Sequence, residues 1–233
     1  MPQTKSSFSR VNRSESQAEE YYSRLSGFYD LLASSEKKFI KQGLILLDPK
    51  PEDKILEIGS GTGFAQLHLA GFVSKGFSVG LDLSEGMCQV AQKKLREVGY
   101  DNQAYLVRSN TLPIPFQSGV FDGVFTSFTL ELFDSPQIPV VLREIQRVLK
   151  PGGRLVVVSL SKDQPLPLMG RLYERLHDRY PKLLDCRPIP VKTLVMSAGF
   201  RIDESRDMKM WGLPVIQILS KKSEDLPIYR HPT

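Results

Sequence analysis

The segment from Ile55 to Gly63, with the sequence ILEIGSGTG, constrains the fold of this 233-residue chain more than any other. A short apolar run ends there in three glycines at alternate positions, Gly59, Gly61 and Gly63. Glycine has no Cβ atom, so this backbone can turn sharply out of a buried strand and a ligand can approach it closely. The pattern therefore predicts a strand, a ligand-binding turn and then a helix.

A second apolar run, Val79 to Asp82, also ends in an acid. If the two runs are neighbouring parallel strands, Asp82 lies beside the glycine turn, where its carboxylate can accept hydrogen bonds from both hydroxyls of a ribose. An N-cap for the next helix would be the other role for Asp82, but Ser84 fits that role better. The two runs together predict a site for a cofactor that contains a nucleoside.

The glycine spacing narrows the choice of cofactor. A dinucleotide-binding turn reads G-x-G-x-x-G and points a helix N-terminus at a pyrophosphate, whereas this chain reads G-x-G-x-G with Glu57 two residues before the first glycine. A carboxylate at that position would repel phosphate and attract a cation. The turn therefore favours S-adenosylmethionine, with Glu57 near its methionine amino group. Glu57 could instead be a partner of the helix N-terminus.

Later motifs follow in an order that strengthens this interpretation. They are Arg108–Phe116, Phe121–Phe125, Arg147–Gly153 and the strand Arg154–Ser159. With the glycine turn and Asp82, they make the chain resemble class I S-adenosylmethionine-dependent methyltransferases over about 29–220. It is most similar to the group that includes ubiquinone and menaquinone biosynthesis and small-lipid methyltransferases. The resemblance implies an α/β fold: a Rossmann-like, doubly wound sheet of seven strands, mostly parallel, with a reversed C-terminal strand.

Hydrophobic periodicity predicts the same alternation of strands and helices. Strands are expected near 54–58, 77–82, 104–108, 122–127 and 154–160, followed by β-like runs at 200–207 and 210–220. Helices are expected near 19–32, 36–47, 63–72, 85–98, 137–149, 168–180 and 191–198. We predict one methyltransferase domain over 19–222 with an N-terminal helical cap, between a disordered tail at 1–18 and a C-terminal tail at 223–233.

The resemblance implies a set of residues around the cofactor. The predicted cofactor-binding residues are Tyr29, Glu57, Gly59, Ser60, Gly61, Gly63, Asp82, Leu83, Met87, Ser109, Asn110, Thr111 and Ser127. Tyr29 would be a lid residue. Met87 would pack on adenine, although a methionine at helical spacing is as often part of a core.

The adenine end departs from the pattern of the family. Related sequences often carry an acid at the position of Arg108, where it would accept a hydrogen bond from the adenine amino group. Arginine cannot accept that bond. Asn110 has a side-chain carbonyl and is the predicted substitute, with Ser109 and Thr111 beside it.

Candidates for chemistry and for the methyl acceptor follow the fourth strand and the last third of the chain. Glu131 is the predicted general base or acceptor-orienting residue, since related sequences often carry histidine there; a solvated loop carboxylate is the alternative. Phe128, Arg187 and His177 are the predicted substrate residues. Arg187 could equally form a structural ion pair, and a lone histidine on a charged helix usually lies on the surface.

Composition limits the other possibilities. The two cysteines are too few for a disulfide framework and predict a reducing cytoplasm, and the spacing of the histidines and cysteines predicts no metal site. The 13 basic and 9 acidic residues of 160–233 would allow peripheral membrane contact but no stable insertion. No arginine-rich tract points to nucleic acid. We expect a monomer or a homodimer.

The combined expectation is an enzyme that transfers a methyl group from S-adenosylmethionine to a small molecule by in-line displacement. The acceptor would be a quinone precursor, a lipid head group or another metabolite. Two alternatives of other classes stay open: a non-catalytic module that binds S-adenosylmethionine, and an NAD-dependent oxidoreductase.

Overall fold

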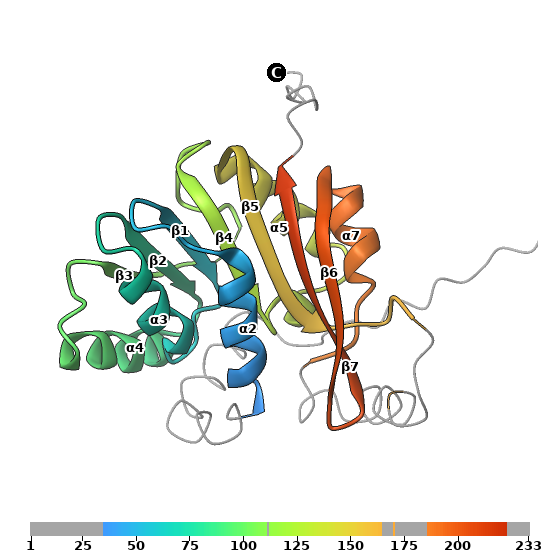
Figure 1. The fold of residues 1–233 in the computed structure, drawn as a ribbon, viewed down its shortest axis with the longest axis horizontal. Coiled ribbons are helices and arrows are strands. Elements are labelled where there is room, and N and C mark those ends of the chain that lie inside the picture. Colours follow the sequence, from blue (N-terminus) through green and yellow to red (C-terminus); the bar gives the residue numbers. More distant parts are fainter. Residues whose placement is uncertain (1–34, 111, 165–169, 171–185, 223–233) are drawn as a thin grey trace, which may run out of the picture.

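The computed structural model describes residues 35–110, 112–164, 170 and 186–222 (Figure 1). The helix predicted at 19–32, the helix predicted at 168–180 apart from residue 170, and the two predicted tails lie outside the described residues. So do the predicted site residues Tyr29, Thr111 and His177.

A seven-stranded sheet forms the centre of the molecule, in the order β3-β2-β1-β4-β5-β7-β6 (Figure 1). The strands are β1 (Lys54–Ile58), β2 (Phe77–Asp82), β3 (Ala104–Arg108), β4 (Phe121–Ser127), β5 (Leu149–Leu160), β6 (Phe200–Met210) and β7 (Leu213–Lys222). The pairs among β1 to β5 are parallel, whereas β7 is antiparallel to both β5 and β6. The predicted fold, including the reversed last strand beside the fifth, is confirmed.

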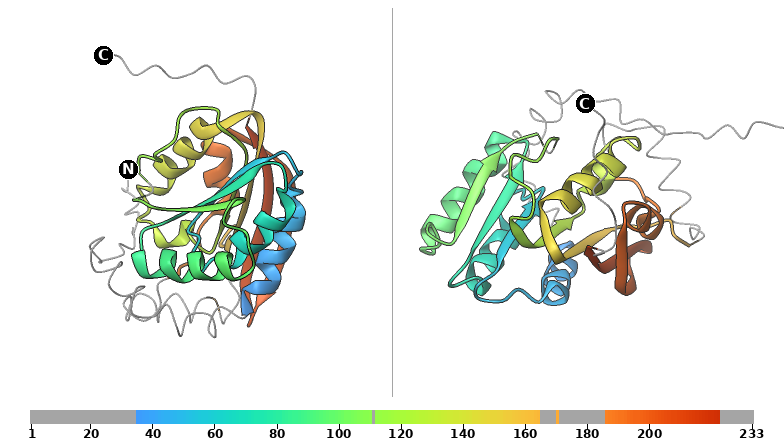
Figure 2. Two further views of the ribbon diagram at one scale, coloured as in Figure 1. Left: turned by 90° about the vertical axis from the view of Figure 1, so that its left-hand side faces the viewer. Right: turned by 90° about the horizontal axis from the view of Figure 1, so that it is seen from above.

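Helices cover both faces of this sheet. They are α2 (Lys37–Leu47), α3 (Phe64–Phe72), α4 (Glu85–Glu97), the 3₁₀ turn η2 (Leu130–Leu132), α5 (Ile138–Val148) and α7 (Val191–Ser197). Residues of α2 and α3 pack in one hydrophobic cluster and residues of α5 and α7 in another. Figure 2 shows α2 and α5 on opposite sides of the sheet.

The strand sequences explain why both faces are covered. Along β5, Leu155 and Val157 point into the α5 cluster, whereas Val156 and Val158 point into the α2 cluster. All four are 1% exposed or less. Side chains of a strand alternate between faces, so a continuous apolar run buries both sides at once, as a parallel sheet requires.

Some boundaries differ from the sequence prediction. Strand β5 begins at Leu149 rather than near 154, because Leu149 pairs with Phe121 before a register shift in β4. Strand β6 runs to Met210 and β7 begins at Leu213, since their pairing continues up to a two-residue turn, and β7 ends at Lys222, which pairs with Phe200. The segment between β3 and β4 has no helix among its described residues.

The fold brings the ends of five strands to one edge. Because β1 to β5 run parallel, Ile58, Asp82, Arg108, Ser127 and Leu160 end on the same side of the sheet, which we call the carboxyl edge. In sheets of this kind ligands bind beyond that edge, at the point where the strand order reverses. Here the reversal lies between β1 and β4.

Candidate active site

The three glycines of the turn after β1 have positive φ angles, each for its own reason. A Cβ atom on Gly59 would lie 2.2 Å from Thr129 Oγ1, and one on Gly63 would lie 2.7 Å from Ala91 Cβ. A Cβ atom on Gly61 would meet no described heavy atom within 4 Å. The first and third glycines therefore allow close packing, whereas Gly61 presents bare backbone to open space.

The same turn is tied to the neighbouring strand. The backbone N–H groups of Gly59 and Ser60 both donate to the carbonyl of Leu81, at 2.9 and 3.0 Å. The Ser60 side chain points toward β2, since a Cβ atom on Gly80 would lie 2.7 Å from that of Ser60. The predicted contact of Ser60 with a cofactor stays a prediction.

Asp82 is held rigidly at the end of β2. Its Oδ2 atom accepts from Gly61 N at 2.8 Å and its Oδ1 atom from Ser84 N at 2.9 Å. Burial raises the pKa of this carboxyl and the backbone donors oppose the rise. Ser84 Oγ in turn accepts from Met87 N at 3.2 Å, which confirms Ser84 as the N-cap of α4. Asp82 therefore stands beside the bare backbone of Gly61, with lone pairs left for further donors.

Glu57 has a buried partner that the sequence did not reveal. The Glu57 carboxylate is 2% exposed and accepts from Gln66 Nε2 at 2.8 Å, while Gln66 Oε1 accepts from Ser78 Oγ at 2.8 Å. Burial raises the pKa of Glu57 to about 8, against the effect of the Gln66 hydrogen bond. The side chain lies under the turn and positions α3; its predicted contact with the methionine amino group remains a prediction.

The end of β3 is arranged by local hydrogen bonds. Ser109 N donates to the carbonyl of Asp82 at 3.0 Å, and Asn110 Oδ1 accepts from Leu112 N at 3.3 Å. Arg108 pairs with Glu85 at 3.0 Å. Ser109 and Asn110 thus lie at the carboxyl edge beside Asp82, where an adenine contact was predicted.

The helix that follows Asp82 supplies two further predicted contacts. Met87 is 2% exposed, as expected of a core side chain, and Leu83 is partly exposed next to Asp82. Their placement is compatible with a ring packed near the start of α4.

The turn after β4 contains a strained residue. Phe128 has a φ of +49°, in the left-handed region that bulky residues rarely adopt. Its ring is 4% exposed and lies 6.3 Å from the Phe39 ring, edge to face. Thr129 Oγ1 donates to the carbonyl of Ser127 at 2.9 Å. This turn closes against Gly59 and against the start of α2, so it forms one wall of the site.

Glu131 is fully buried rather than solvated. Its carboxylate accepts from Ser159 Oγ at 2.8 Å and from Leu160 N at 3.1 Å, both at the end of β5. Burial raises its pKa to about 7, although these donors oppose the rise. The solvated alternative for Glu131 is therefore wrong.

A second carboxylate joins Glu131, and the sequence prediction missed it. Glu36 directly precedes α2, and its backbone carbonyl accepts from Phe39 N at 2.9 Å. Its pKa is raised to about 7, first by burial and then by the charge of Glu131. In the sequence, Glu36 looks like any acid at the start of a helix. Only the tertiary packing of α2, through Phe39, against Phe128 in the turn after β4 brings it near Glu131.

Arg187 lies at the same edge but points into the protein. It is 7% exposed, and its Nη2 atom donates to the carbonyl of Phe133 at 2.7 Å. Burial lowers its pKa, and the nearby Asp134 opposes this. This placement agrees with the alternative that Arg187 has a structural role. Its contact with a methyl acceptor stays a prediction.

The residues at the carboxyl edge fit S-adenosylmethionine. The space beside Gly61 would be filled by any Cβ atom there, so a ligand can rest on the backbone, and Asp82 can accept hydrogen bonds from a ribose. Ser109, Asn110 and Leu83 lie near Asp82 at this edge, and their contact with adenine stays a prediction. Among the described residues, no group of three or more His, Cys, Asp or Glu could hold a metal. The prediction that the protein needs no metal stays a prediction.

Fold and site together define a class I S-adenosylmethionine-dependent methyltransferase. A family model described as a methyltransferase domain matches residues 55–153. A ubiquinone/menaquinone biosynthesis C-methyltransferase from Wigglesworthia glossinidia brevipalpis is 32% identical over 180 residues, which are 75% of this chain and 69% of the relative.

Two solved structures share the fold. The cyclase SpnF has a TM-score of 0.72 at 17% identity and covers 90% of this chain and 97% of its own. Geranyl diphosphate C-methyltransferase from Streptomyces coelicolor A3(2), in complex with S-adenosyl-L-homocysteine, has a TM-score of 0.62 at 16% identity and covers 78% and 76%. At these identities the likeness extends to the fold alone.

The chain belongs to the S-adenosylmethionine-dependent methyltransferase family that contains the ubiquinone/menaquinone biosynthesis enzymes. It is an enzyme that uses S-adenosylmethionine to methylate a small molecule. This membership decides against the NAD-dependent oxidoreductase and the non-catalytic module. Within the described residues, no helix is both long and apolar enough to cross a membrane.

Gly61→Val tests the turn. A valine side chain would fill the space beside Gly61, so S-adenosylmethionine affinity measured by calorimetry should fall by about 100-fold or more, while the fold is kept. Gly99→Val is the matched control, because Gly99 also has a positive φ and open space around its Cβ position but lies in the turn after α4. Equal loss in both variants would show that strain, not ligand exclusion, explains the result.

Proposed function

We propose that the methyl acceptor is a small molecule that must lose a weakly acidic proton, such as the hydroxyl of a hydroquinone or phenol with an apolar substituent. The observation that carries this proposal is the pair Glu36 and Glu131, two carboxyls with pKa values raised to about 7 beside the end of β4. A base with a pKa near the working pH is the most effective one. The relative named above is a quinone-biosynthesis C-methyltransferase, which supports this acceptor class.

The chain's own residues first bind and orient the cofactor. When bound, S-adenosylmethionine supplies a methyl group on a positively charged sulfur. An acceptor atom with a free electron pair can bond to that methyl carbon in line, and the sulfur leaves as a neutral thioether. Asp82 would hold the ribose, the backbone around Gly61 would support the amino-acid part, and Ser109 and Asn110 would contact adenine. Ser127 would face the reacting centre. Correct placement of two reactants supplies much of the rate enhancement in such reactions.

Glu36 would then take the proton of the acceptor. Its side chain is half-buried, so a ligand at the carboxyl edge can reach it, whereas Glu131 is 0% exposed and pinned to β5. Glu131 would act through Glu36, because its negative charge raises the pKa of the neighbouring carboxyl. The proton moves from the acceptor oxygen or carbon to a Glu36 oxygen, and the electron pair stays on the acceptor.

An apolar wall completes the acceptor site in this proposal. Phe128 would pack against the ring or tail of the acceptor, and the fully buried Phe39 ring supports it from behind, edge to face. Arg187, His177 and the lid residue Tyr29 keep their predicted roles as proposals. We also infer a cytoplasmic enzyme, since two cysteines are too few for a disulfide framework, with one catalytic domain over 19–222 that is a monomer or a homodimer.

Labelled methyl transfer tests the acceptor class. The protein is incubated with methyl-labelled S-adenosylmethionine and a panel of hydroquinones, phenols and primary amines, and products are identified by mass. We expect label on hydroquinones or phenols that carry an apolar substituent. Label on the amines alone would contradict the proposal, because their unprotonated form needs no base.

The pH dependence of kcat separates the roles of the two carboxylates. Because their pKa values are raised to about 7, both groups are largely protonated below that pH, and kcat should rise as pH increases through about 7. Glu36→Gln should lower kcat by about 100-fold or more. Glu131→Gln removes the charge that opposes ionisation of Glu36, so the midpoint of the rise should move to lower pH while part of kcat remains.

The control for both variants is Glu97→Gln, an exposed helix residue that pairs with Lys93. Its pH profile should match that of the unmodified protein. A fully active Glu36→Gln variant, or an unchanged midpoint in Glu131→Gln, would overturn the assignment of these roles.

A further inference from the structure

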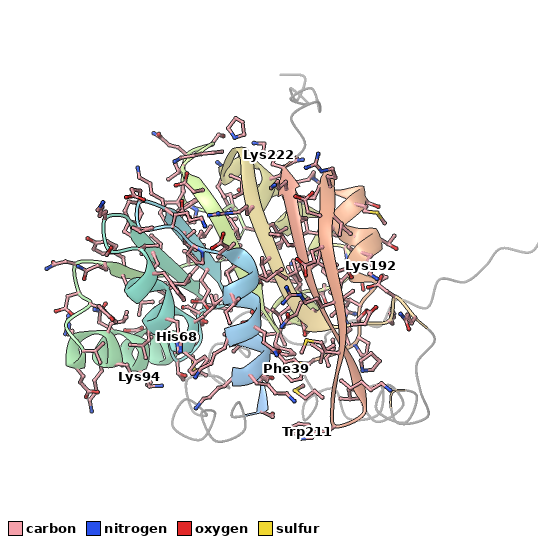
Figure 3. All side chains as sticks on the ribbon, viewed as in Figure 1. Phe39, His68, Lys94, Lys192, Trp211 and Lys222 are labelled. Atoms are coloured by element: carbon pink, nitrogen blue, oxygen red, sulfur yellow. The ribbon has the colours of Figure 1, made fainter. Side chains whose placement is uncertain are left out.

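The tip of the β6–β7 hairpin carries Trp211, the single tryptophan of the chain. Its side chain is 72% exposed, more than any other large hydrophobic side chain among the described residues. Figure 3 shows Trp211 at the end of the hairpin, at the same end of the molecule as Phe39 and opposite Lys222. An indole with that exposure offers a large apolar surface and one N–H donor to whatever the tip meets.

The backbone at the tip is unusual for a tryptophan. Met210 pairs with Leu213, so Trp211 and Gly212 form a two-residue turn, with φ angles of +51° and +81°. Two-residue turns with both central φ angles positive strongly favour Asn, Asp and Gly. A bulky residue in this conformation is an outlier, and such outliers gather at functional positions.

The base of the hairpin is rigid and adjoins the active site. Met210 and Leu213 are each 7% exposed and belong to the same hydrophobic cluster as Phe39 and Phe128. The N–H of Ser161, just after β5, donates to the carbonyl of Pro214 at 3.0 Å. The tip therefore projects beyond the carboxyl edge from a fixed base, with its aromatic side chain directed outward.

The charge around the tip favours binding to an anionic surface. Lys209 is exposed at the last-but-one position of strand β6, two residues before the tryptophan, and forms no ion pair within the described part of the chain. The negative charge of Asp207 is balanced by Lys192, at 3.8 Å. The outermost groups are thus one indole and one unbalanced ammonium.

We propose that the β6–β7 tip docks the enzyme on anionic lipid bilayers, with Trp211 inserted at the headgroup level and Lys209 on the lipid phosphates. Tryptophan is the side chain that prefers the membrane–water interface, and lysine adds attraction to anionic lipid. A protein partner would need a contact of about 800 Å² on each side, far more than a two-residue tip presents. The proposal is independent of the acceptor, yet it would turn the carboxyl edge toward a membrane that dissolves apolar acceptors.

Intrinsic fluorescence tests the proposal directly, because all tryptophan emission comes from Trp211. The full chain is titrated with vesicles of phosphatidylcholine containing phosphatidylglycerol, without cofactor or acceptor, so that the result is independent of methyl transfer. We expect emission to shift to shorter wavelength and to be quenched when the lipids carry bromine near the headgroup. Both effects should weaken as salt rises. Unchanged emission at low salt would overturn the proposal.

Co-sedimentation of variants shows whether the tip causes the binding. Trp211→Ser should lower the vesicle partition coefficient by about 10-fold, and Lys209→Glu should lower it for anionic vesicles only. Tyr105→Ser is the matched control, because this side chain is 48% exposed on β3 at the other end of the sheet. Circular dichroism confirms that each variant is folded.

Two further outcomes would overturn the proposal. Equal sedimentation of Trp211→Ser and the unmodified protein would assign binding to another surface. Binding of the unmodified protein, but not of Trp211→Ser, to a component of membrane-free cell extract, with no binding to vesicles, would assign the tip to a soluble protein partner.

Discussion

The site depends on the close contacts that the turn after β1 makes at the carboxyl edge, and Gly59 and Gly63 allow two of them because they have no Cβ atom. Gly59 lies against Thr129 of the turn after β4, Gly63 lies against Ala91 of α4, and the N–H groups of Gly59 and Ser60 reach the end of β2. A side chain at Gly59 would push away the turn after β4, and one at Gly63 would push α4 away from the start of α3. With these contacts made, Gly61 and Asp82 stand side by side facing open space.

Buried carboxylates are the second recurring feature of this edge. Glu57, Asp82 and Glu131 are all held by hydrogen bonds, and burial raises the pKa of each. Their roles differ with their partners: Glu57 supports α3 through Gln66, whereas Asp82 is held by backbone donors and keeps lone pairs directed outward. A cationic cofactor beside such groups would favour their ionised forms. In the proposed function, cofactor binding would thus be coupled by charge to the ionisation of these carboxyls.

The sequence predicted the frame of the site well because its signals are local. The glycine turn, the acid that ends β2 and the Ser84 N-cap are each encoded within a few residues, and the structure has them where they were expected. The partners of Glu57 and Glu131 could not be predicted, since Gln66 and Ser159 reach them only through tertiary packing. Glu36 was missed for the same reason. Substrate roles of Phe128 and Arg187 remain predictions, because both side chains are buried and no ligand contact tests them.

The most direct test of the account compares two aspartates at opposite edges of the sheet. Asp82 and Asp122 each accept a backbone N–H, but Asp122 lies near the start of β4 and pairs with Lys150. Calorimetry of S-adenosylmethionine binding should show affinity about 10- to 100-fold weaker in Asp82→Asn, as expected for loss of a charged hydrogen-bond acceptor, and unchanged in Asp122→Asn. Unchanged affinity in Asp82→Asn, or a larger loss in Asp122→Asn, would contradict a cofactor site at the carboxyl edge.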